Sequence, residues 1–382
     1  MRGVVALAMG IGVGGCGFSL SLGDSQADAS IDMQTADAPC SFSSFIETCG
    51  RPRGDSLSLV GTHMFDTDGG LLTDPIGTII PLKTLTVNLA GNGIDVQAIF
   101  VHDLMLDGFL VARGSRPFAI IATGDVELVG NSVLEVGLGG AGSQVACATP
   151  AMNGEVDSTG GGGGGGGGLG AHGGTGGNGD TDGDGSQGAD GGTAIAPPSA
   201  IIGGCRGGAG GDGDEKGGRG GAGGGAVFIV SATKITIGGT AGINAGGEGG
   251  QGGMKSSGNG GDAGGGGGGS GGTILLEAPL VRNDGTLSAN GGGGGEGSDN
   301  GGSSGDPGDH ALLGTSAPTG GDGNSTGGGP GASGGNSSMP GGGPKPSGAR
   351  GGGGGGGGSV GYIRIVATQM NLGSKVSPLP FQ

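Results

Sequence analysis

Aromatic and basic residues are scarce in this chain. It has no Trp, one Tyr and nine Phe, and its 16 Lys and Arg face 33 Asp and Glu, which gives a net charge of −17. Sugar clefts and single-strand nucleic-acid platforms commonly use aromatic faces, and nucleic-acid binding needs positive charge. We therefore expect no nucleic-acid partner.

Proline is also rare for so glycine-rich a chain. The sequence contains 113 Gly but only 17 Pro in 382 residues, without a strict three-residue period. A collagen triple helix is therefore excluded. Glycine loses much backbone entropy on folding, so either other interactions offset that cost or the glycine stretches stay flexible.

Residues 1–15 have the pattern of a secretion signal. One positive charge, Arg2, precedes a short apolar run that is too short to span a bilayer. Val13-Gly14-Gly15 then precedes Cys16, and VGGC resembles the lipobox of bacterial lipoproteins. The resemblance implies lipidation at Cys16 and a membrane anchor, and Gly17 in place of Asp implies the outer membrane. Ordinary secretion is the alternative.

Residues 16–39 are small, polar and acidic, which predicts a flexible tether. The rest, 40–382, is predicted to be a single domain. With Cys16 lipidated, four cysteines remain in an exported protein, and three pairings are open. We favour Cys40–Cys49 and Cys147–Cys205; the alternative is that one or both pairs stay reduced.

The domain contains a repeat of about twenty residues. Each copy has an apolar strand, a kink, a second short alternating strand, a glycine and a brief third strand. The five copies are 99–114, 118–137, 226–247, 273–291 and 362–378. Alternation predicts these inward side chains: Leu104, Leu106, Val126, Leu128, Leu134, Val136, Ile235, Ile237, Ile243, Ala245, Leu287, Ala289, Met370 and Leu372. The pattern predicts an all-β fold, a parallel β-helix or similar solenoid. A β-sandwich is the alternative.

The glycine-rich insertions, about 139–225, 247–272 and 291–360, all follow a third strand and end before a first strand. Chains without side chains can lie close together as three-residue-per-turn helices and hydrogen-bond to one another. We expect either such a polyglycine II-like bundle or flexible loops.

A calcium loop is suggested by Asp180, Asp182 and Asp184, which match the start of DxDxDG. Gly191 stands where the EF-hand pattern needs Glu, so a solvated acidic loop is the alternative. No other metal or cofactor is indicated.

No catalytic residues can be assigned. Gly268–Gly272 spells GxSxG, but its polyglycine flanks cannot form the strand and helix of a nucleophile elbow. Glu127, Glu277 and Asp284 could line a groove, yet no set of acid, base and cation can be assembled around them.

The chain as a whole resembles glycine-rich, PGRS-like surface lipoproteins of Gram-negative bacteria. The residues that carry this resemblance are the VGGC at 13–16, the Cys40/Cys49 pair, and strands ending in INAGG or SANGG before polyglycine. It implies a non-enzymatic structural or adhesive role on the cell surface, with a surface protein or glycan as partner. A β-helix enzyme acting on extracellular polysaccharide and a calcium-dependent binding module are the alternatives.

Overall fold

The computed structural model describes residues 41–89, 94–143, 147, 149–180, 186–197, 201–255, 262–299, 303–322, 328–339, 341–343 and 351–381. Cys16 and Cys40 lie outside these residues. Residues Ala38–Gln382 belong to one compact unit.

The secondary structure in the described residues consists of strands, which confirms the all-β expectation. The strands are β1 (Leu57–Asp66), β2 (Leu71–Thr73), β3 (Ile79–Ile80), β4 (Lys83–Asn88), β5 (Asp95–Val101), β6 (Leu104–Arg113), β7 (Phe118–Ala122), β8 (Val126–Leu128), β9 (Val133–Glu135), β10 (Ala226–Ser231), β11 (Lys234–Ile237), β12 (Gly242–Asn244), β13 (Thr273–Asn283), β14 (Thr286–Ser288), β15 (Tyr362–Leu372) and β16 (Val376–Ser377). They form one large sheet in which most pairs are parallel.

The repeat copies pair in three parallel ladders. The first ladder joins β5, β7, β10, β13 and β15. The second runs through β1, β6, β8, β11, β13 and β15, and the third through β6, β9, β12, β14 and β16. In the last two copies the first and second strands merge into the single long strands β13 and β15. The antiparallel pairs β1–β2, β2–β3 and β4–β5 lie at the N-terminal side of the ladders.

One apolar core is shared by all three ladders. It takes Ile120 and Ile229 from the first, Leu128 and Ile235 from the second, and Leu134 from the third, all buried. Most side chains predicted to face inward are buried in this core. Met370 is not: it is 41% exposed, although it pairs in register with the buried Val281. The reason is that β15 is the last strand of its ladder among the described residues, so no further copy covers it.

The first ladder is buried on both faces. Its strands are therefore uninterrupted apolar runs and not alternating ones. Side chains that point away from the shared core, such as Phe100, Ile121 and Phe228, form a second cluster. Ile46 and Val87 cover that cluster from segments outside the repeat.

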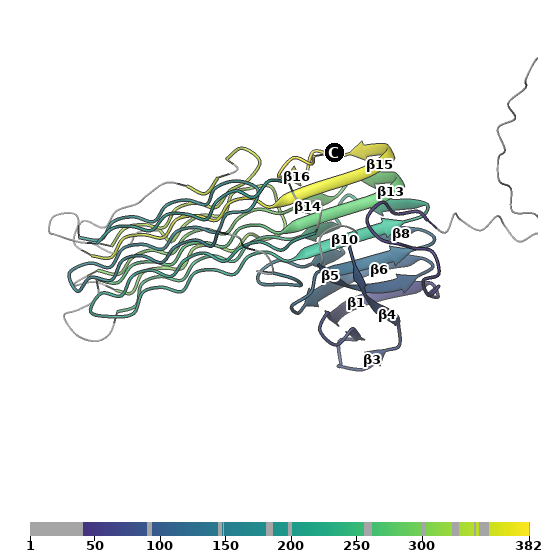
Figure 1. Ribbon diagram of the computed structural model, residues 1–382, viewed down its shortest axis with the longest axis horizontal. Helices are drawn as coiled ribbons and strands as arrows, with labels where there is room; N and C mark the ends of the chain where they lie inside the picture. Colours follow the sequence, from purple (N-terminus) through teal and green to yellow (C-terminus); the bar gives the residue numbers. More distant parts are fainter. Residues whose placement is uncertain are drawn as a thin grey trace, which may run out of the picture. The chain divides into compact units, whose positions relative to one another are not determined.

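The glycine-rich insertions leave the sheet after β9, β12 and β14 and return at β10, β13 and β15. Their extended segments, here called tracts, run side by side away from one end of the strands (Figure 1). Four tracts are buried along their length: 160–169, 262–272, 291–299 and 351–361.

Backbone hydrogen bonds join each tract to several neighbours. In 264–272, successive N–H groups donate in turn to three different tracts at N–O distances between 2.7 and 2.9 Å. The donor–acceptor pairs are Gly264–Gly211, Gly265–Gly353, Gly266–Gln251, Gly267–Gly208, Gly268–Gly356, Gly269–Glu248, Ser270–Cys205, Gly271–Ser359 and Gly272–Ala245. A change of partner that recurs every third residue is the repeat of a polyproline II-type helix.

We expect a buried tract to reject even one methyl group. A Cβ at Gly267 would overlap the carbonyl group of Gly165 in the neighbouring tract. Gly267→Ala should lower the free energy of unfolding by roughly 1–3 kcal/mol, as overpacking does. Urea denaturation measures the change. Gly239→Ala is the matched control, because the nearest atom there, the Asp284 oxygen, is 3.8 Å away; equal losses in both variants would contradict close packing of the tracts.

Candidate functional site

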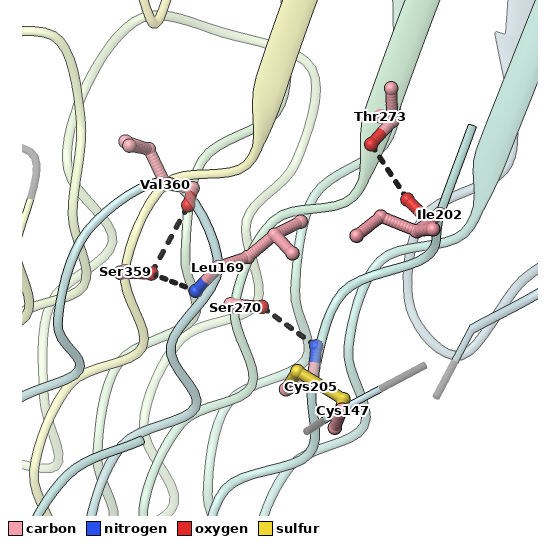
Figure 2. The surroundings of a disulfide bond; sticks show 8 residues. All are labelled: Cys147, Leu169, Ile202, Cys205, Ser270, Thr273, Ser359 and Val360. Carbon is pink, nitrogen blue, oxygen red and sulfur yellow. Dashed lines mark hydrogen bonds between the residues drawn. A yellow bond between two sulfur atoms is a disulfide. The ribbon is translucent and has the colours of Figure 1, made fainter. Parts of the chain in front are cut away.

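The junction between strands and tracts contains a disulfide bond and three buried hydroxyl groups (Figure 2). Cys147 and Cys205 are bonded, with 5.6 Å between their Cα atoms, and the bond spans 58 residues of sequence. On the chain-entropy model, closing a loop of this length stabilises the fold by ~4 kcal/mol. The predicted Cys147–Cys205 pair is therefore present and ties the first insertion at its base. Cys49 is also disulfide-bonded.

The hydroxyl groups at this junction bind backbone rather than a ligand. The Ser270 hydroxyl oxygen accepts the Cys205 N–H at 2.8 Å, and that of Ser359 accepts the Leu169 N–H at 2.9 Å. The Thr273 hydroxyl donates to the Ile202 carbonyl at 2.6 Å (Figure 2). Ser270 has no exposed surface. The serine of this GxSxG sequence is therefore a buried structural residue and not an exposed nucleophile.

The N-terminal segment, residues 41–49, lies against the outer face of the first ladder. The Glu277 carboxylate accepts hydrogen bonds from the Ser43 hydroxyl at 2.6 Å and from the Ser44 N–H and hydroxyl at 2.7 Å each. The Phe45 ring packs edge-on against Phe228 at 5.8 Å, and the Arg364 guanidinium lies 5.0 Å from its centroid. These contacts hold the segment in place.

A cavity of about 350 Å³ lies beside this segment, lined by Phe42, Glu277, Ala278, Pro279 and Val366–Thr368. Among the described residues that line it, Glu277 is the only ionisable one. The carboxylate there already accepts three hydrogen bonds, so the cavity offers no free acid and base pair.

The other two acids considered for a groove are also engaged, at separate places. Glu127 on β8 pairs with Lys234 at 3.0 Å, and Asp284 pairs with Arg282 at 2.7 Å. These pairs are solvent-exposed and stabilise the fold only slightly. The structure does not bring Glu127, Glu277 and Asp284 together as one site.

Two asparagines, one at the end of β12 and one just after β14, hold an insertion against the sheet. Asn244 donates to the Glu135 carboxylate at 3.0 Å and to the Ala311 carbonyl at 3.2 Å. Burial raises the pKa of Glu135. Asn290 donates to the Gly314 carbonyl at 2.9 Å. The sequence reasoning did not assign these roles, although INAGG and SANGG mark both positions.

Several acidic residues gather at the distal end of the tracts, the end away from the strands. Asp262 begins one tract and Asp299 ends another, and both are buried. Asp180 ends a third tract, where its N–H donates to the Gly351 carbonyl at 2.9 Å. Asp182 and Asp184 lie outside the described residues. Among the residues that the structure does describe, no group of three His, Cys, Asp or Glu side chains is placed to hold a metal ion.

Asp262 is the most unusual ionisable group at this end. It is 3% exposed, and its Oδ1 atom is buried without a hydrogen-bond partner. Burial, with the like charges of Asp214, Asp299 and Asp180, raises the pKa of Asp262 to about 6. The folded protein therefore binds a proton here more tightly than the unfolded chain does.

Comparison with known proteins identifies no relative. No family model matches the chain, and no similar curated protein or solved structure was found. Within the described part of the chain, no helix is long and apolar enough to cross a membrane.

We expect Asp262 to make stability depend on pH. Its pKa lies near 3.8 in the unfolded chain and about 6 when folded. Its favourable contribution is therefore complete below about pH 4 and is lost as the pH rises through 6. Without divalent cations, Asp262→Asn should be more stable than the parent at pH 7.5 by roughly 1–3 kcal/mol, and the gap should close towards pH 4. Urea denaturation at several pH values in this range measures the difference in unfolding free energy between the two proteins. A difference that does not change with pH would show that folding leaves the pKa of Asp262 unchanged.

Proposed function

We propose that this chain is a non-enzymatic, lipid-anchored surface protein with a structural or adhesive role, and that its ladders form a parallel β-helix-like solenoid. In this proposal the shared core supports the tracts, and the tracts carry the surface that meets a partner. The three successive parallel ladders around one core favour a solenoid over a β-sandwich.

The observation that supports this role most is the placement of side chains on the outer tracts. In 186–192 the exposed positions Gln187 and Asp190 are three residues apart, and of the two residues between them Gly188 is half-buried and Ala189 is buried. In 201–212 the residues Arg206, Ala209 and Asp212 follow the same spacing and are at least partly exposed. These two tracts thus expose one side chain other than glycine in each three-residue turn, and hydrogen bonds hold the backbone that carries it. Such a surface suits binding of a protein or glycan by many weak contacts.

The proposed cellular location depends on the lipobox-like residues at 13–16. In the proposal, Cys16 carries the lipid, residues 16–39 form the tether, and the anchor holds the protein at the outer membrane or cell surface. The aromatic scarcity of the chain favours polar rather than stacking contacts with a surface glycan.

Lipid labelling tests the anchor. In a Gram-negative host, the parent chain should incorporate radiolabelled palmitate and partition with the membrane fraction. Cys16→Ala should lose the label and appear in the soluble fraction, while Cys147→Ala/Cys205→Ala, which removes the disulfide at the base of the first insertion, should keep it. Equal labelling of the parent and Cys16→Ala would contradict the proposal, as would an unlabelled parent.

A further inference from the structure

Strand β15 ends the first and second ladders, and part of its outer edge is open (Figure 1). On one side it pairs with β13. On the other side, the only strand partner within the described residues is Phe381, whose N–H donates to the Ile363 carbonyl at 3.0 Å. The C-terminal segment thus covers the start of this edge and leaves 366–372 without a neighbouring strand. The opposite end of these ladders, in contrast, carries the antiparallel strands β2 and β4.

The hydrogen bonds of β15 show which residues direct their N–H and C=O groups to the open edge. The Tyr362 and Gly373 N–H groups donate to carbonyl groups at the start and end of β13. These groups alternate between the two sides of a strand. Counting from each end, Ala367 and Met370 both direct theirs to the open edge. The alternation changes phase between these two residues, where the first ladder passes into the second, because Ala367 and Leu372 both pack against the shared core although five residues separate them.

The open edge is apolar on its inner side and carries no charge. Ala367 and Leu372 pack against the shared core, and Met370, which faces the same way, is 41% exposed. No ionisable residue and no proline stands between Arg364 and Lys375, in a chain of net charge −17. Charged side chains and proline are the usual means by which proteins prevent edge strands from pairing. This edge has neither, so it can accept another strand.

We propose that the edge of β15 binds a second copy of this chain, with the two β15 strands antiparallel about a two-fold axis between Thr368 and Gln369. That axis places Ala367 of each copy opposite Met370 of the other. Both residues direct their backbone groups to the edge, so each pair can exchange two N–H···O=C bonds.

The symmetry of the edge favours a second copy over an unrelated strand. A two-fold axis between Thr368 and Gln369 maps the change of direction between the ladders onto itself, whereas a straight strand would match only one side of it. The inner side chains of Ala367 and Met370 also meet across the axis, which covers the exposed end of both cores. The uncharged edge is a suitable contact for two acidic chains that repel each other elsewhere. This inference does not depend on the lipid anchor or on the adhesive role.

Sedimentation equilibrium tests the proposal. The chain carrying Cys16→Ala, so that no lipid contributes to association, should pass from monomer to dimer as its concentration rises, with a dissociation constant on the order of 10–100 µM, as expected for a small interface. Met370→Lys places a charge on the edge and should raise that constant about tenfold or more. Met105→Lys is the matched control, because Met105 is 39% exposed but lies on β6, inside the second ladder; it should associate like the parent.

Cross-linking gives a second measurement that does not depend on the folding of Met370→Lys. Gln369 is exposed and lies next to the proposed axis, so Gln369→Cys of two paired copies would lie within reach of a disulfide bond. Oxidation should convert it to a covalent dimer, and Met105→Cys should stay monomeric on a non-reducing gel. A chain that is monomeric at every concentration would overturn the proposal, as would a dimer that a folded Met370→Lys leaves intact, or equal cross-linking at positions 369 and 105.

Discussion

Direct hydrogen bonding between glycine backbones is the interaction on which the rest of this structure depends. In the buried tracts no side chain separates the chains, so each N–H reaches a neighbouring carbonyl group. These bonds satisfy polar groups that would otherwise be buried without partners. They also offset part of the large entropy cost of ordering glycine. A single Cβ on such a tract meets backbone atoms, as at Gly267, which explains why these stretches contain almost nothing but glycine.

The ladders fix where the tracts begin and end. Hydrogen bonding passes from tract to strand without a break: the Gly272 N–H donates to Ala245 at the end of one repeat copy, and the Tyr362 N–H at the start of another donates to Gly272. The apolar core therefore sets the position of glycine segments that have no core of their own. The Cys147–Cys205 bond and the asparagine contacts of the third ladder add covalent and polar ties at the same junction.

The repeat, the all-β class and the Cys147–Cys205 pair could be predicted from sequence because apolar alternation and cysteine number are local signals. The exposure of Met370 could not be predicted, because it depends on the lack of a following copy to cover β15. The N-terminal segment's contact with Glu277 was also missed, because it joins residues more than two hundred positions apart without a motif. The spacing of glycine was a further sequence signal that could have distinguished buried tracts from outer ones. Uninterrupted glycine runs such as 160–168 and 351–358 form buried tracts. Glycine pairs separated by one other residue mark tracts with partly exposed side chains, such as 201–212. Asp262 is one of many acids in the sequence, and it is distinguished in the structure by a buried Oδ1 atom without a hydrogen-bond partner.

Amide hydrogen exchange in the longest glycine run tests the central claim most directly. If the tracts form a hydrogen-bonded interior, the amides of 160–168 should exchange orders of magnitude more slowly than in an unstructured chain, comparably to those of β7 and β10. Exchange of 160–168 at the rate of an unstructured peptide, while β7 and β10 stay protected, would contradict the account.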